Sequence, residues 1–176
     1  RAENEESRTF LRGAILIYEA IGDYLLRYSQ KARELGLDEL SEVCYKAATQ
    51  APDDFYTALQ LTWTITFVQA SYITPNPTVT LGRLDQILYP LYKKGLEDGS
   101  LDREKARALI TDLYCKHNLN MGRGEHQVGD ETNATTFKRI YNFDSPQYLL
   151  LAGTDKNGAP AVNELTKRFS ECIEPS

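Results

Sequence analysis

The stretch that decides the fold is Thr80-Leu81-Gly82-Arg83-Leu84-Asp85-Gln86-Ile87-Leu88-Tyr89-Pro90-Leu91-Tyr92. It joins a Gly-Arg-x-Asp-Gln signature to an apolar and aromatic segment, which predicts a helix over about 83–97. Arg83 carries five fixed donors that can reach a carboxylate or backbone carbonyls, and Asp85 lies near the positive end of the predicted helix. We therefore expect Arg83 and Asp85 to form a structural ion pair at the helix start rather than to contact substrate.

Other helices follow from apolar residues spaced three to four positions apart, which places them on one helix face. The predicted helices cover about 7–35, 39–50, 55–72 and 102–119. Their predicted caps are Gly36 at the end of the first, Asp38 before the second, Asp53 or Asp54 before the third, and Ser100 or Asp102 before the last. Pro75 and Pro77 end the third helix, and a loop is expected from there to about Leu81.

The C-terminal part predicts minor β structure. Residues 120–146 form a polar, glycine-containing loop by composition. The apolar run after Pro146 fits a buried strand over 147–152, and Asp155–Gly158 fits a turn. Pro160 suits the first turn of a terminal helix. The fold class is therefore mainly α with minor β, as one partial domain over 1–176 with a helical region (7–119), a loop (120–146) and a strand-turn-helix (147–176).

Composition excludes several classes of function. The formal net charge is −5 and the pI is about 5.1, so no basic surface favours nucleic acid. No apolar run reaches the roughly 18 residues that span a bilayer, so we expect no membrane contact and a cytoplasmic protein. Cys44, Cys115 and Cys172 lie far apart, which indicates free thiols in a reducing compartment. The charged start at Arg1, without methionine, reads as an internal one.

The 80–92 run resembles the Gly-Arg-Leu-Asp-Gln-x-Leu-Tyr-Pro-x-Tyr segment of glycyl radical enzymes of the pyruvate formate-lyase family. The resemblance continues through residues 93–101 and into the next helix at 104–106. Residues 10–32 and 51–63 are similar to a long helix and a proline turn of that family. Gly153–Thr166 is similar to its Gly-Gly-x-Asp-x-Gly-x-Asp-Ala-x-Asn-Glu-Leu-Thr stretch, whereas Asn118 to Ser145 matches nothing.

The resemblance implies an α/β barrel for the parent protein, to which this chain would contribute outer helices and about one strand. Family members use a glycyl radical in an Arg-Val-x-Gly-Tyr motif, installed by an S-adenosylmethionine-dependent activase, and a thiyl cysteine in Gly-Cys-x-Glu. Neither motif occurs in this sequence. Cys172, in Glu171-Cys172-Ile173-Glu174, falls only six residues after Thr166, so we expect it to pack as a small apolar group. No catalytic residue and no cofactor of this chain are therefore predicted.

Two loop segments are weaker candidates for a site. By resemblance, Asn142, Phe143 and Gln147 would line the substrate cavity, although Phe143 in a core is the competing interpretation. The glycine-rich 122–130 segment, together with His117, has neither phosphate-loop nor metal-ligand spacing, so no metal site is predicted.

Two functions remain open at this point. The first is a fragment, inactive alone, of a glycyl radical enzyme that cleaves C–C, C–N or C–O bonds of a small polar substrate anaerobically. Its partners would be the remainder of the parent chain and a homo-oligomer. The alternative is a non-catalytic helical interaction or scaffold module.

Overall fold

The structure is a computed structural model that describes residues 4–73, 79–119 and 148–173. The chain divides into two compact units, 1–52 and 53–176, where the sequence predicts one partial domain. The described part is mainly helical, with one pair of short parallel strands, which confirms the mainly α class with minor β. Within the described residues, no helix is long and apolar enough to cross a membrane.

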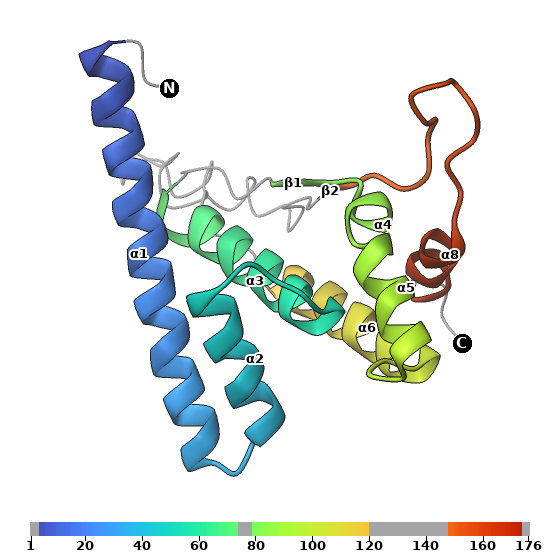
Figure 1. The fold of residues 1–176 in the computed structure, drawn as a ribbon, viewed down its shortest axis with the longest axis horizontal. Helices are drawn as coiled ribbons and strands as arrows, with labels where there is room; N and C mark the ends of the chain where they lie inside the picture. The colour runs from blue at the N-terminus through green and yellow to red at the C-terminus, as the bar shows by residue number, and fades with distance from the viewer. Residues whose placement is uncertain (1–3, 74–78, 120–147, 174–176) are drawn as a thin grey trace, which may run out of the picture. The chain divides into compact units, whose positions relative to one another are not determined.

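The first unit is a hairpin of α1 (Glu5–Glu34) and α2 (Asp38–Thr49) (Figure 1). Asn4 caps α1 by accepting the Ser7 backbone N–H at 2.8 Å. Gly36 has φ +72°, which confirms the predicted glycine after α1. The prediction that Asp38 caps α2 is wrong, because the cap position is Leu37 and Asp38 is the first helical residue, where its charge complements the helix dipole.

The hairpin core involves only the C-terminal half of α1. A buried polar contact lies within it, where the Ser29 hydroxyl donates to the Ser41 carbonyl at 2.8 Å. The buried apolar residues around this contact are Ile21, Leu25 and Ala32 of α1 and Val43, Cys44 and Ala47 of α2. The C-terminal end of α2 meets α1 at Gly22, where an added Cβ would lie 3.4 Å from the Ala48 carbonyl oxygen.

The second unit begins with α3 (Phe55–Val68), which Asp54 caps by accepting the Thr57 N–H at 2.8 Å. This helix forms despite its β-branched residues, and three of its threonine hydroxyls are satisfied by carbonyls four residues earlier. The helix then widens into a π-helical turn, η1 (Gln69–Ile73), where the sequence predicts a continuous helix to 72.

The segment after the signature is two helices rather than the single predicted helix over 83–97. They are α4 (Leu84–Ile87) and α5 (Tyr89–Asp98), which meet at Leu88. Pro90 has no N–H for the carbonyl of Gln86, so one continuous hydrogen-bond ladder cannot pass this point. Gly99 then adopts φ +77°, and Asp102 caps α6 (Arg103–Leu119) by accepting the Lys105 N–H at 2.7 Å.

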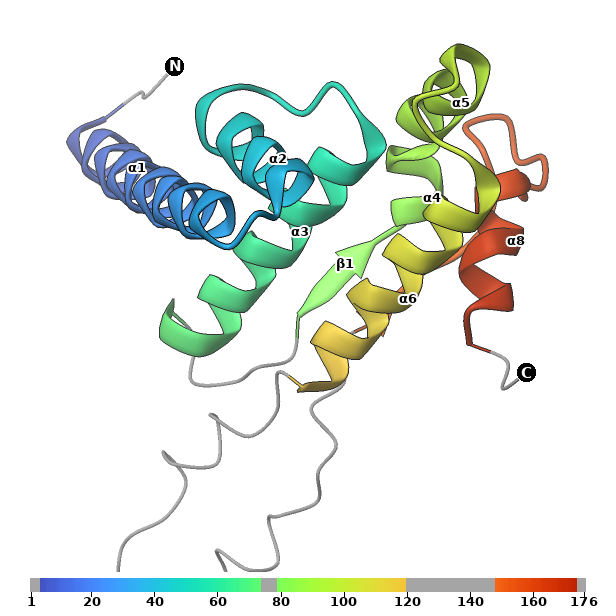
Figure 2. The same cartoon turned by 90° about the horizontal axis from the view of Figure 1, so that it is seen from below.

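The core of the second unit joins α3, α4, α5, α6 and α8 (Glu164–Glu171), with α6 running between α3 and α8 (Figure 2). Tyr92, Ile110, Leu165 and Phe169 are its fully buried centre. The aromatic rings meet edge to face, with centroids 5.7 Å apart for Phe55 and Tyr92 and 6.2 Å apart for Tyr114 and Phe169.

The two strands are β1 (Thr80–Gly82) and β2 (Tyr148–Leu149), which pair in parallel. β1 lies at the end of the segment that was predicted to be a loop. The sequence does not reveal this strand locally, because its partner lies 68 residues away. The predicted buried strand is shorter than 147–152 and is not buried, since Tyr148 is 52% and Leu150 55% exposed. Pro160 does not open the terminal helix; it pairs with Thr154 in an isolated bridge, and α8 begins at Glu164.

Candidate functional site

The Gly-Arg-x-Asp-Gln signature lies against a segment from the far end of the chain, residues 150–163, which we call the strap. The side chain of Asp85, fully buried at the start of α4, is the centre of this contact. Its Oδ2 atom accepts hydrogen bonds from the Ala152 N–H at 2.8 Å, the Thr166 hydroxyl at 2.6 Å and the Gln86 amide at 2.9 Å. One carboxylate oxygen therefore ties α4 to the strap and to α8.

Arg83 and Gln86 attach the strap at two further points. The Arg83 guanidinium donates to the Thr154 carbonyl at 3.0 Å and lies against Gly153, where an added Cβ would sit 3.5 Å from its Cζ. The Gln86 amide donates to the Ala161 carbonyl at 2.7 Å. The three polar residues of the signature therefore bind the strap at two points near its beginning and at one point near its end.

The strap is shaped by its own backbone bonds. It enters through Ala152 with φ +58° and Gly153 with φ +81°, and it reverses direction between Thr154 and Pro160, which form an antiparallel bridge. The Ala161 N–H returns to the Gly153 carbonyl at 2.9 Å, and the Asp155 carboxylate accepts two backbone N–H groups inside the predicted turn. A left-handed alanine costs on the order of 1 kcal/mol, which the hydrogen bond from its N–H to Asp85 offsets.

The strap ends in a capping box. The Asn163 side chain accepts the Thr166 N–H at 2.9 Å, and the Thr166 hydroxyl accepts the Asn163 N–H at 3.0 Å. The Asn163 amide also donates to the Asp85 backbone carbonyl at 3.0 Å. The start of α8 is thus fixed by its own cap and by the signature together.

The expected ion pair between Arg83 and Asp85 is not among the contacts of the described residues. Arg83 bonds to a carbonyl of the strap, and Asp85 bonds to a backbone N–H of the strap, the Thr166 hydroxyl of α8 and the neighbouring Gln86 amide. One atom on each side chain, Nε of Arg83 and Oδ1 of Asp85, is buried without a hydrogen-bond partner. Both residues hold structure together, and neither belongs to a nucleophile and base pair.

A second polar contact lies where α5, α6 and α8 meet. Glu164 accepts from the Arg103 guanidinium at 3.0 Å and from the Tyr92 hydroxyl at 3.4 Å. Burial raises the pKa of Tyr92, with a smaller contribution from the Glu164 charge and against the opposing effects of Arg168 and Arg103, so its hydroxyl stays protonated and able to donate. This contact reinforces the position of α8 that the capping box sets.

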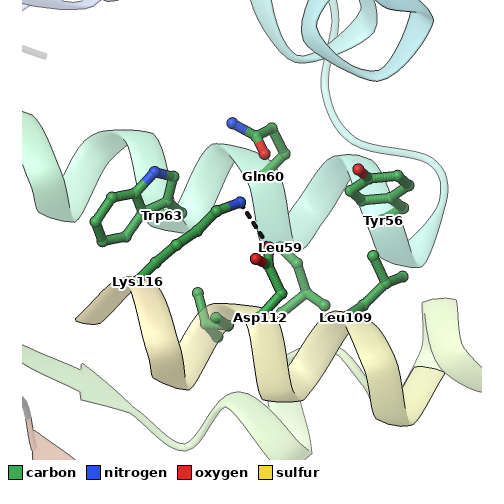
Figure 3. A pocket seen from close by; sticks show the side chains of 8 residues that line it. Tyr56, Leu59, Gln60, Trp63, Leu109, Asp112 and Lys116 are labelled. Carbon is green, nitrogen blue, oxygen red and sulfur yellow. Dashed lines mark ion pairs between the residues drawn. The ribbon is translucent and has the colours of Figure 1, made fainter. Parts of the chain in front are cut away.

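Between α3 and α6 there is a narrow crevice, drawn in Figure 3. Tyr56, Gln60 and Trp63 line it from α3, and the Lys116–Asp112 ion pair, 2.6 Å long, lies along its α6 side. Its cavity volume of about 10 Å³ is room for about one water molecule. This crevice is therefore a packing feature and not a small-molecule site.

His117 lies beside the crevice, near the end of α6. It is 6% exposed, its ring meets Trp63 edge to face at 5.3 Å, and neither of its nitrogens has a hydrogen-bond partner. Burial lowers the pKa of His117 to about 4, from an ordinary value of 6.5. The folded protein therefore holds a neutral imidazole that the unfolded chain would protonate near pH 6.5.

Acid should destabilise the fold through His117. Between pH 6.5 and pH 4 the unfolded state binds more protons than the folded state, so the free energy of unfolding falls as the pH falls. The loss should reach up to about 3 kcal/mol at pH 4, at roughly 1.4 kcal/mol per pKa unit. Urea unfolding of the protein and of His117→Phe across pH 4–7 measures it, because phenylalanine keeps the ring contact without titrating. Equal pH dependence in both proteins would exclude this role for His117.

The remaining predicted site residues can be placed only in part. Cys172 is the C-cap residue of α8. It is half-buried against the core, and its thiol lies 3.7 Å from the Arg107 carbonyl oxygen. Asn142, Phe143 and Gln147 lie outside the described residues. Within the described ranges, no group of three or more His, Cys, Asp or Glu side chains is placed to hold a metal ion.

Gln86, Asn163 and Thr166 were not predicted to have a role. All three form hydrogen bonds with Asp85 and join the signature to the strap and to α8. The Asn-x-x-Thr spacing before Leu165 and Phe169 is a capping signal that could have placed the start of α8 at Glu164. No local pattern reveals that Thr166 of this cap also bonds to a carboxylate 81 residues earlier.

Comparisons with known proteins agree on one family. The family described as PFL-like, pyruvate formate lyase-like, matches residues 1–174. Trans-4-hydroxy-L-proline dehydratase of Clostridioides difficile is 26% identical over 151 residues, covering 80% of this chain and 18% of that protein. The (2S)-3-sulfopropanediol dehydratase of Klebsiella oxytoca is 28% identical over 182 aligned positions, covering 96% and 21%. The crystal structure of a glycyl radical enzyme from Archaeoglobus fulgidus superimposes with a TM-score of 0.72 at 28% identity, covering 88% of this chain and 20% of that one.

Proposed function

Because the chain belongs to the pyruvate formate lyase-like family, we propose that it is an internal part of a larger glycyl radical enzyme. The parent would carry out radical dehydration or a related lyase cleavage of a small polar substrate in the cytoplasm under anaerobic conditions. This chain alone would be inactive. The observation that carries the proposal is its extent: it spans about a fifth of the length of the relatives above, and its sequence has neither the radical glycine motif nor the Gly-Cys-x-Glu motif.

The strand pair supports a larger sheet. Parallel sheets occur almost only with both faces covered, and two short strands are marginal alone. β1 and β2 contribute three and two residues, and Tyr148 and Leu150 are exposed beside them. In the proposal, further strands of the parent complete an α/β barrel around this pair, and the exposed side chains of Tyr148 and Leu150 face the remainder of the parent chain.

Arg83, Asp85 and Gln86 hold the strap in place, and this suggests a structural role for this part of the chain in the parent enzyme. In α/β barrels, active sites form from the loops that follow the carboxyl ends of the strands. The strap follows β2 in this way, and the signature fixes it at three points. We assign Arg83 and Asp85 a structural role there. The family resemblance alone supports a place for Asn142, Phe143 and Gln147 at the substrate cavity.

The parent's radical would reside on a glycine outside this sequence, installed by an S-adenosylmethionine-dependent activase. Nothing in these 176 residues would need to hold a cofactor. The residues of this chain would instead help to form the substrate cavity and to exclude water from it.

The intact mass of the endogenous gene product tests the proposal. We expect a product several times heavier than the 19.9 kDa of this chain, whose peptides include residues 1–176 and the radical glycine motif. An endogenous product of 19.9 kDa would contradict it and would favour a non-catalytic helical interaction module. Anaerobic dehydratase assays of the long and short proteins, each with activase, provide the second comparison.

A further inference from the structure

The strap contains a tight turn at residues 155–158, which we call the strap turn, in the loop between β2 and α8 (Figure 1). The Asp155 carbonyl accepts the Gly158 N–H at 3.1 Å, and Gly158 has φ +83°. The Oδ1 atom of Asp155 accepts the N–H groups of Asn157 and Ala159 at 2.8 and 2.9 Å. Asp155 therefore holds the turn through its carbonyl and its carboxylate, although every residue of the turn is exposed to water.

Asn157 stands out among the asparagines of this chain. It is the only one that a glycine follows in the sequence. Its side chain is exposed and makes no hydrogen bond to any described residue. The Asn163 side chain, in contrast, is held on both sides, since its oxygen accepts the Thr166 N–H and its nitrogen donates to the Asp85 carbonyl. Asn157 can therefore turn its side chain onto the backbone of a following residue that has no Cβ in the way.

We propose that Asn157 and Gly158 form a self-modification site, at which the chain converts this asparagine to isoaspartate and aspartate without an enzyme. The Gly158 backbone nitrogen attacks Cγ of Asn157, and the Cγ–Nδ2 bond breaks. The Gly158 proton passes through water to the departing amide nitrogen, which leaves as ammonia. The product is a succinimide ring, which a water molecule opens at either carbonyl to give aspartate or isoaspartate. In sum, an amide and a water molecule become a carboxylic acid and ammonia.

The strap turn slows this reaction without preventing it. The Gly158 nitrogen can attack only after its N–H has left the Asp155 carbonyl, so the turn has to open first. Water competes for the exposed hydrogen bonds of the turn, and opening it is therefore a small local fluctuation. Asp155 is accordingly a restraint on the rate, and its removal speeds up the reaction.

The modification changes the strap between its points of attachment. The signature binds the strap at Thr154 and at Ala161, on either side of Asn157. Isoaspartate adds a methylene group to the backbone at this position and places a second carboxylate beside Asp155, where like charges repel. We therefore expect the modified chain to hold the strap less firmly and to unfold at a lower urea concentration than the unmodified chain.

The reaction needs only two adjacent residues and water. It is a property of this chain itself and does not depend on which surfaces of the chain other proteins contact. Radical chemistry plays no part in it, so its presence or absence leaves the proposed function untouched.

Peptide mapping by mass spectrometry, after incubation of the whole chain in mildly alkaline water enriched in heavy oxygen, tests the proposal. Digestion in ordinary water ensures that the label reports the incubation alone. The tryptic peptide 157–167 contains both Asn157 and Asn163, so the second asparagine is an internal control. We expect heavy oxygen and the mass change from amide to acid at Asn157, as isoaspartate and aspartate that chromatography separates, and an unmodified Asn163.

Two substitutions separate the site from the turn that restrains it. Asn157→Gln should abolish the label in this peptide, because the longer side chain would have to close a larger ring. Asp155→Ala should raise the rate by roughly fivefold or more, because it removes two exposed hydrogen bonds that hold the turn. The proposal is overturned if Asn157 keeps its amide while a synthetic peptide of residues 152–163 loses it, if Asn163 reacts as fast, or if Asp155→Ala reacts no faster than the unsubstituted chain.

Discussion

Replacing Asp85 with alanine should lower the free energy of unfolding of the 53–176 unit by about 3–5 kcal/mol. The substitution removes a fully buried acceptor of three hydrogen bonds and leaves the Ala152 N–H and the Thr166 hydroxyl without their partner. The left-handed Ala152 also loses the bond that holds it. Urea unfolding monitored by the single tryptophan, Trp63 of α3, measures the change in the same unit.

The isosteric substitution provides the control for this result. Asp85→Asn can place its amide oxygen at the Oδ2 position and its amide nitrogen at Oδ1, which has no partner, so it should cost less than alanine. A double-mutant cycle of Asp85→Ala with Thr166→Val should give a coupling energy of about 1 kcal/mol or more, because the two side chains share a 2.6 Å bond. Additive effects, or an alanine variant as stable as the parent chain, would contradict the role assigned to Asp85.

Replacing Phe169 with alanine should cost about 3–5 kcal/mol in the same assay, the usual range for removing a buried phenylalanine. Phe169 is fully buried, and its ring meets Tyr114 of α6. The loss should release α8 from the core while its cap at Asn163 remains intact.

A substitution of Val162, an exposed residue of the strap just before α8, serves as the reference for Phe169. Val162→Ala, at a position 56% exposed, should change the free energy of unfolding by less than about 0.5 kcal/mol. Comparable effects of the two substitutions would show that α8 is not part of the core of this unit.

The helices could be predicted from the sequence because their signals are local. The apolar spacing places α1, α2, α3 and α6 within a few residues of their observed bounds. Asp54 and Asp102 are the caps, each one of the two candidates predicted for its helix. A capping side chain bonds to a backbone N–H only two or three residues later, so the local sequence is enough to predict where a helix begins.

The rest depends on distant contacts. β1 exists because it pairs with β2, and the strap is held in place because Asp85, Arg83 and Gln86 bond to it across about 70 residues. The break at Leu88 is a different case, because Pro90 is a local signal for the end of a helix. The prediction of one helix over 83–97 followed the apolar and aromatic spacing instead. The signature itself was recognisable, but its partners were not, and the expected ion pair of Arg83 with Asp85 followed from considering only neighbouring residues.

Electron paramagnetic resonance tests the central claim, that the chain is an internal part of a glycyl radical enzyme and not a catalyst alone. The 176-residue chain and the full-length gene product would each be incubated anaerobically with a radical-generating activase, S-adenosylmethionine and reductant. We predict a glycyl-type doublet from the full-length protein, with oxygen cleaving its chain at the radical glycine, and no such signal from the short chain. A glycyl-type doublet from the short chain, or a full-length product that acquires no radical, would contradict the account.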